Sequence, residues 1–228
     1  MRRVLVAGGT GALGAGVLAA LLEASHPVTC TWLVDGERKR VEQEFADADG
    51  LSLVQADLMT AEGAEEAVRA APDLGAVVNL VGGFFSGPKA HETEIDDYER
   101  MLALNLTPGF NLVRASFPSL LNGGGGAYVG VSARPALQPF QGSAAYSTAK
   151  AAVLAFVRAL DADYAKEGIR SNAILPSVID TPANRRATPD ADFSKWVQPY
   201  DIGRVVRHLV SDDCAPTSGA AIPVYGRA

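Results

Sequence analysis

The sequence predicts an α/β fold in which a doubly wound parallel sheet of about seven strands carries helices on both faces. Three observations predict it. Short apolar runs alternate with amphipathic segments along all 228 residues, no linker or shift in composition interrupts them, and the hydrophobic content of 48% can bury a sizeable core. We therefore expect residues 1–228 to form a single domain.

Seven runs have the length and composition of strands, and helical patterns fill most of the intervals between them. These runs are residues 3–7, 28–34, 51–55, 74–80, 127–131, 170–175 and 221–225. Pro223 cannot donate a hydrogen bond to a neighbouring strand, so the last strand is expected at an edge or a bulge.

A glycine-dense turn follows the first strand and leads into an amphipathic helix. Gly8, Gly9, Gly11 and Gly14 allow a tight turn whose amides can approach a pyrophosphate at the positive N-terminus of the helix. The alternative is a purely structural turn between strand and helix, but a position directly after a buried strand at the chain start favours binding. A nucleotide site is the favoured interpretation.

Two further polar residues end or follow predicted strands. Asp57 follows the third strand, and Asn79 lies at the end of the fourth. Ligands of open α/β sheets bind beyond the carboxyl ends of the strands, so both side chains are expected to line that edge.

Tyr146 and Lys150 are four residues apart in a predicted helix, residues 144–164, and so share one face of it. A phenol exchanges protons near neutral pH only when a nearby cation stabilises its phenolate. The pair by itself is common in helices. Together with the glycine turn it indicates an acid/base centre beside a nucleotide.

The net charge of −6 and the absence of a basic run argue against nucleic acid and anionic membranes as partners. No apolar stretch is long enough to span a bilayer, and the strand predicted within residues 1–7 leaves no room for a signal peptide, so a cytoplasmic location is expected. Cys30, Cys214 and three scattered histidines form neither a disulfide framework nor a metal-binding pattern.

These motifs resemble those of the short-chain dehydrogenases/reductases over nearly the whole chain. In order, they are AGGTGALG (7–14), Asp57-Leu58, Asn79-Leu80-Val81-Gly82, Asn105, Tyr146-x-x-x-Lys150, and NAILPS (172–177) followed by Thr181-Pro182. The resemblance implies a Rossmann-like fold, NAD(P) binding, and hydride transfer between nicotinamide and a small carbonyl or alcohol.

The resemblance also implies a role for each matched residue. Tyr146 would be the acid/base, Lys150 would lower its pKa and hold the nicotinamide ribose, and Asn105 would position a proton-relay water. Thr181 would contact the nicotinamide amide, and Asp57 the adenine. The residues expected at the cofactor are Gly8, Gly9, Thr10, Gly11, Ala12, Leu13, Gly14, Trp32, Asp57, Leu58, Asn79, Val81, Gly82, Tyr146, Lys150, Pro176 and Thr181.

Ala133 occupies the position, 13 residues before the tyrosine, where the family usually has its catalytic serine. Ser132 is its neighbour and would face the opposite way if the strand is extended there. A bulge could turn Ser132 inward, or Ser143 could supply the hydroxyl. The glycine string and the missing serine are similar to quinoid dihydropteridine reductase, a member of the wider family, so a pterin-like substrate is a second possibility.

Trp32 stands where an NAD-binding member of the family usually has an acidic residue, and Asp35 comes three residues later. The run Arg38-Lys39-Arg40 follows. Without a carboxylate at Trp32 the main repulsion against a 2′-phosphate is missing, which favours NADP over NAD.

Residues 177–200 lack a long apolar period and are expected to form a substrate lid. Thr188-Pro189 predicts the start of a short helix carrying Phe193 and Trp196, with Pro199 as its stop. These two aromatics either close over the substrate or anchor the loop. Residues 82–87, which include Phe84 and Phe85, are expected to form the opposite wall of the pocket, with rings that can stack on a flat substrate.

Two functions remain open. The first is an NAD(P)-dependent reductase of a small substrate, and the second is a cofactor-binding regulatory or structural protein with little turnover. The small residues of the helix at 144–164, together with the family's habit of pairing through such helices, predict a homodimer or homotetramer.

Overall fold

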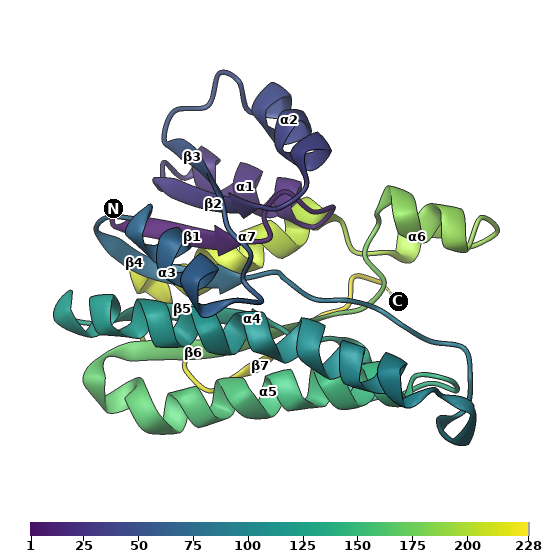
Figure 1. The fold of residues 1–228 in the computed structure, drawn as a ribbon. Coiled ribbons are helices and arrows are strands. Elements are labelled where there is room, and N and C mark those ends of the chain that lie inside the picture. The colour runs from purple at the N-terminus through teal and green to yellow at the C-terminus, as the bar shows by residue number, and fades with distance from the viewer. Residues whose placement is uncertain (228) are drawn as a thin grey trace.

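Seven parallel strands form one sheet through the centre of the molecule (Figure 1). The computed structural model describes residues 1–227. The strands are β1 (Arg3–Ala7), β2 (Val28–Trp32), β3 (Leu51–Gln55), β4 (Leu74–Asn79), β5 (Gly126–Val131), β6 (Ile169–Pro176) and β7 (Ala221–Val224). Their order is β3-β2-β1-β4-β5-β6-β7, so the sheet grows in both directions from the β1–β4 pair.

All seven predicted strands are present, and three of them end earlier than predicted, including the last, which ends at Val224 rather than at residue 225. The strand predicted at 28–34 stops at Trp32, because Val34 is the N-cap of the next helix and Asp35 begins it. The strand predicted at 74–80 ends at Asn79. Pro223 lies in β7, an edge strand as predicted.

Helices cover both faces of the sheet (Figure 1). The helices are α1 (Gly14–Glu23), α2 (Asp35–Glu44), α3 (Ala61–Arg69), α4 (Ile95–Asn122), α5 (Ala144–Tyr164), α6 (Pro182–Ala187) and α7 (Pro199–Val210). Helices α1 and α7 pack together on one face, while α4 packs against α3 and α5 on the other.

The alternation of side chains along the strands creates two hydrophobic cores. In β1, Val4 and Val6 point toward α1 and α7, whereas Leu5 and Ala7 point toward α3, α4 and α5. Both sets are buried because the sheet is covered on both sides, which explains why β1 is a continuous apolar run.

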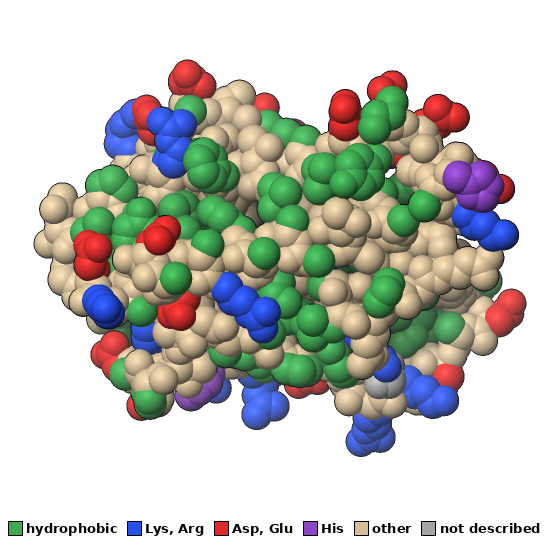
Figure 2. Space-filling view, turned by 90° about the horizontal axis from the view of Figure 1, so that it is seen from below, with side chains coloured by type: hydrophobic (Ala, Val, Ile, Leu, Met, Phe, Trp, Pro, Cys, Tyr) green, Lys and Arg blue, Asp and Glu red, His purple; other side chains and the backbone are tan. Residues whose placement is uncertain are grey.

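The face of the molecule below α5 in Figure 1 is shown in Figure 2. Hydrophobic side chains are spread across this face, and most Lys, Arg, Asp and Glu side chains lie toward its margins. Phe110 of α4 is 53% exposed and packs against Phe156 of α5, with ring centroids 6.2 Å apart.

The segment 177–200 contains α6 and a 3₁₀ turn, Phe193–Lys195, but not the helix predicted after Thr188-Pro189. Helix α6 begins instead at Pro182, with Thr181 as its N-cap, and Thr188 is its C-cap. Pro199 does not stop a helix but begins α7, because its fixed φ and missing N–H suit the first helical position.

Over residues 1–227, none of the helices combines the length and the apolar character that a membrane crossing requires.

Candidate active site

The candidate site lies at the carboxyl ends of β1 and β4, where the strand order reverses. The chain leaves β1 toward β2 and β3 and returns to β4 on the other side. The Leu80 amide donates to the Ala7 carbonyl at 2.9 Å, so the loops after the two strands start side by side. In open α/β sheets this reversal is where a ligand crevice forms.

The glycine turn between β1 and α1 can hold a pyrophosphate. A Cβ built on Gly14 would lie 1.9 Å from the Gly9 carbonyl oxygen, so only glycine allows α1 to begin this close to the turn. No side chain caps α1, and its first turn contains no acidic residue. The helix therefore presents free amides and its positive end to the turn, which is what an anion requires. Ala12, at the tip, is exposed.

The opposite side of this turn is held by β2 and α2. Thr31 accepts a hydrogen bond from the Gly8 amide at 2.9 Å, and the Thr10 hydroxyl donates to Glu37 at 3.2 Å. Arg40 donates to the Thr10 carbonyl. Arg38 lies over the Trp32 ring, with Cζ 5.3 Å from the centroid.

Asp57 is exposed beyond β3, where its Oδ1 accepts from the Met59 amide at 3.0 Å. Leu58 is buried among core residues, so only its backbone can face a ligand. Asn79, at the end of β4, is buried and accepts from the Val81 amide at 3.1 Å. Asn79 thus fixes the start of the loop that carries Gly82.

Three of the predicted residues, Gly82, Asn105 and Lys150, lie next to one another. A Cβ built on Gly82 would lie 2.6 Å from Asn105 Oδ1 and 3.1 Å from Lys150 Nζ, so the missing side chain leaves room for both polar groups. Lys150 Nζ donates to the Val131 carbonyl at 3.0 Å. Asn105 and Lys150 are 3% and 6% exposed, so the polar groups of this cluster are shielded from bulk water.

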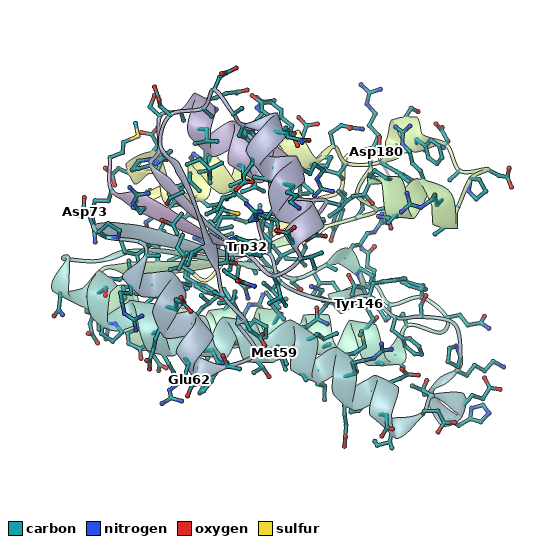
Figure 3. All side chains as sticks on the ribbon, turned by 45° about the horizontal axis from the view of Figure 1, so that its top comes forward. Trp32, Met59, Glu62, Asp73, Tyr146 and Asp180 are labelled. Atoms are coloured by element: carbon teal, nitrogen blue, oxygen red, sulfur yellow. The ribbon has the colours of Figure 1, made fainter. Side chains whose placement is uncertain are left out.

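Tyr146 lies beside this cluster, at the right of Figure 3. The Lys150 ammonium is 5.8 Å from the centroid of its ring. Burial raises the pKa of Tyr146 to about 12 and lowers the pKa of Lys150 to about 8. Burial of the phenol causes the Tyr146 shift, whereas the family resemblance implies a pKa that Lys150 lowers.

Neither nearby serine presents a free hydroxyl. Ser132 donates to the Lys150 carbonyl at 2.7 Å and is 1% exposed. Ala133 is extended, with φ −161° and ψ 159°, and the Ser132 amide donates to the Ile174 carbonyl of β6 at 2.9 Å. The Ser143 hydroxyl donates to the Phe140 carbonyl at 2.6 Å and lies 2.8 Å from the Ser147 hydroxyl.

Pro176 ends β6, and Thr181 lies within the segment 177–200 that we expected to close the site. The Thr181 hydroxyl accepts from the Asn184 amide at 3.2 Å and so serves as a helix cap. Asp180, labelled in Figure 3, binds Arg185 through two hydrogen bonds of 2.5 and 2.7 Å and accepts from Gln198 at 2.8 Å. Arg185 and Gln198 hold the pKa of Asp180 down at about 2.

Thr31, Glu37 and Arg40 were not expected at the site. The basic run at residues 38–40 was the one signal, and the sequence could not tell a solvated run from one folded back on the glycine turn. Within residues 1–227, no cluster of His, Cys, Asp and Glu side chains has an arrangement that could hold a metal ion.

Comparison with known proteins agrees with this architecture. Residues 2–192 match the family model described as short chain dehydrogenase. A 2,5-dichloro-2,5-cyclohexadiene-1,4-diol dehydrogenase, LinX, of Sphingobium indicum is 27% identical over 97% of this chain and 94% of its own. Acetoacetyl-CoA reductase of Rhizobium meliloti (strain 1021) is 29% identical, covering 99% and 97%.

The solved structure of ElxO with NADP bound has the same fold. It superposes with a TM-score of 0.91 at 22% identity and covers 99% of this chain and 97% of its own. The fold and the family match together define an NAD(P)-dependent oxidoreductase. The chain belongs to the short-chain dehydrogenase/reductase family.

Proposed function

We propose that the protein reduces a small carbonyl compound or a pterin-like substrate, with Tyr146 as the proton donor. The convergence of Asn105 and Lys150 around Gly82, beside Tyr146, is the observation that carries this proposal. With a pKa raised by burial to about 12, Tyr146 is protonated at neutral pH, as a proton donor must be, and a nearby cation would make that proton easier to give.

Different residues of the chain would bind the cofactor and transfer the proton. The glycine turn and the N-terminus of α1 would hold the pyrophosphate, and Asn79, Val81 and Gly82 would line the nicotinamide side. Bound nicotinamide supplies the hydride to the substrate carbon. Tyr146 donates its proton to the substrate oxygen, and the Lys150 ammonium stabilises the phenolate that this step leaves behind.

NADP is the proposed cofactor in preference to NAD. Trp32 offers no carboxylate to a ribose 2′-OH. Arg38 lies over the Trp32 ring, and Arg40 donates to the Thr10 carbonyl. Glu37 lies at the same turn and acts against this preference, while Asp35 and Glu42 already bind Arg38. Arg40 is therefore the better candidate for the 2′-phosphate.

The proposal is tested with purified protein, NADPH or NADH, and a panel of aldehydes, ketones, quinones and quinonoid pterins. Loss of cofactor absorbance with at least one acceptor, and tighter binding of NADPH than of NADH, are expected. The preference should shrink in Arg40→Ala. Tight cofactor binding without turnover of any acceptor would favour the alternative, a cofactor-binding regulatory or structural protein.

A further inference from the structure

Phe84 combines high exposure with contact to the proposed proton donor. Its side chain is 66% exposed, yet its ring lies edge-on to Tyr146, with centroids 4.9 Å apart and planes at 73°. Exposing a large aromatic ring to water is costly. A ring left open at this position is therefore available to a molecule that binds beside Tyr146.

The backbone on both sides of Phe84 is anchored, so its exposure is not that of a frayed loop. Gly83 forms two hydrogen bonds of 3.3 Å with the Asn105 amide, one in each direction. The Gly87 amide donates to the Gly142 carbonyl at 3.0 Å. Phe85 packs against the cluster that contains Met101 and the α5 alanines.

Because residue 133 is alanine and not serine, a bound substrate has one hydrogen-bond donor fewer at this position. The Ala133 methyl group donates no hydrogen bond, and the Ser132 and Ser143 hydroxyls are committed to backbone carbonyls. A reacting oxygen held by Tyr146 alone can rotate about that single hydrogen bond. A productive geometry then requires a second contact that fixes the plane of the substrate.

We propose that Phe84 is a specificity-determining residue that stacks on a planar conjugated ring bearing the reacting carbonyl. This inference rests on the proposed function, since it assumes that the carbonyl is bound at Tyr146. Stacking fixes the plane of the ring, and the Tyr146 hydrogen bond fixes the oxygen within it. A saturated ring of equal size lacks the flat π face and gains less.

The test compares 2-acetylnaphthalene with its saturated counterpart, 2-acetyldecalin, on the NADP⁺-loaded protein by calorimetry. The wild-type protein should bind the planar ketone about 2- to 10-fold more tightly, the range expected for one aromatic pair. Phe84→Leu keeps an apolar side chain and should abolish this ratio, whereas Phe84→Trp should preserve it. Phe140→Leu is the matched control, because Phe140 is also exposed, and should leave the ratio unchanged.

Equal binding of the two ketones by the wild-type protein, weak binding of both, or an unchanged ratio in Phe84→Leu would overturn the inference. Cofactor-dependent turnover is measured separately with small aliphatic aldehydes. Turnover without planar preference removes only the role of Phe84, whereas planar preference without turnover of any carbonyl removes the proposed reaction and leaves a stacking site.

Discussion

Burial shifts the pKa values of Tyr146 and Lys150 toward their uncharged forms. Desolvation holds Tyr146 in its neutral form and makes the charged form of Lys150 costly. The Val131 carbonyl, 3.0 Å from Lys150 Nζ, compensates the ammonium in part. A neutral phenol beside a buried cation is ready to give its proton and to be stabilised once it has done so.

Tyr146→Phe should lower turnover by about 10²–10⁴-fold, the usual contribution of a general acid. The ring and its packing against Phe84 remain in the variant, so cofactor affinity should change little. Steady-state rates and cofactor titration measure the two effects separately. Undiminished turnover with a good substrate would eliminate Tyr146 as the proton donor.

Lys150→Met should stabilise the cofactor-free protein below pH 8. The folded-state pKa of Lys150, about 8, lies below the unfolded value of about 10.4, so below pH 8 the native state bears the full cost of a buried charge. Between the two values the unfolded state binds more protons, and wild-type stability rises with pH. Urea unfolding should show an advantage for the variant of up to roughly 3 kcal/mol at pH 7 that vanishes by about pH 10.5. A difference that does not vary with pH would contradict the assignment.

Ser132→Ala should leave hydride transfer within a few-fold of wild type, because the Ser132 hydroxyl is bound to the Lys150 carbonyl. Loss of a true oxyanion donor would instead cost about 10²–10³-fold. Ala133→Ser should add activity on simple ketones by supplying a donor at the reacting oxygen. Single-turnover rates of both variants decide this, and a hundredfold loss in folded Ser132→Ala would place that hydroxyl in the site.

Spacing along the chain identified residues that are close in sequence, and the family resemblance added Asn105 and Gly82, which meet Lys150 only in three dimensions. Contacts that neither source encodes were overlooked. Tyr146 and Lys150 share a helix, so their proximity follows from the helical period. The contact of Arg40 with Thr10 joins α2 to the glycine turn across 30 residues, and no local pattern encodes it.

At the scale of elements, the main error is the position of the short helix in the segment 177–200, where the same helix-start signal occurs twice. Thr181-Pro182 and Thr188-Pro189 both carry the N-cap and proline that start a helix. The first pair is used, and Asp180, just before it, bonds to Arg185 of the new helix. The Thr188 hydroxyl instead donates to the Asn184 carbonyl, as part of the end of α6. Side-chain contacts within five residues, of Asp180 with Arg185 and of Thr188 with Asn184, separate two similar helix-start signals, whereas the strands and α5 had strong apolar periods.

The two ends of the segment 177–200 are joined where Asp180 binds both Arg185 and Gln198, and we call this junction the stem. Asp180→Asn should loosen it. The folded pKa of Asp180, about 2, is below its ordinary value, so its stabilisation is complete above about pH 4 and is lost as the pH falls through 2. Hydrogen exchange at pH 7 should be faster in the variant at the Val197 amide, which donates to the Val178 carbonyl. Exchange in α5 should not change.

Asp192→Asn is the matched control for this experiment. Asp192 is another carboxylate of the same segment, but it caps only the local turn at Ser194. Equal effects of the two substitutions on the Val197 amide would mean that Asp180 does not hold the stem.

At the scale of the whole molecule, the face over α4 and α5 is the part least suited to water. Phe110 stands exposed next to Phe156, and Ala151, Ala155 and Ala159 of α5 are exposed as well. Hydrophobic side chains continue across this face in Figure 2. The small side chains allow two helices to approach closely, so two copies of the chain could pack α4 and α5 against each other about a twofold axis.

We therefore expect a homodimer or homotetramer at micromolar concentration, measured by sedimentation equilibrium. Phe110→Arg places a charge in the middle of the expected contact and should shift the protein toward smaller species, because an unpaired buried charge is costly. Leu33→Arg is the control, since Leu33 is 59% exposed and lies beyond the end of β2, away from α4 and α5. A monomeric wild-type protein would refute the prediction. If Phe110→Arg does not change the oligomer, the copies pack through a face other than that of α4 and α5.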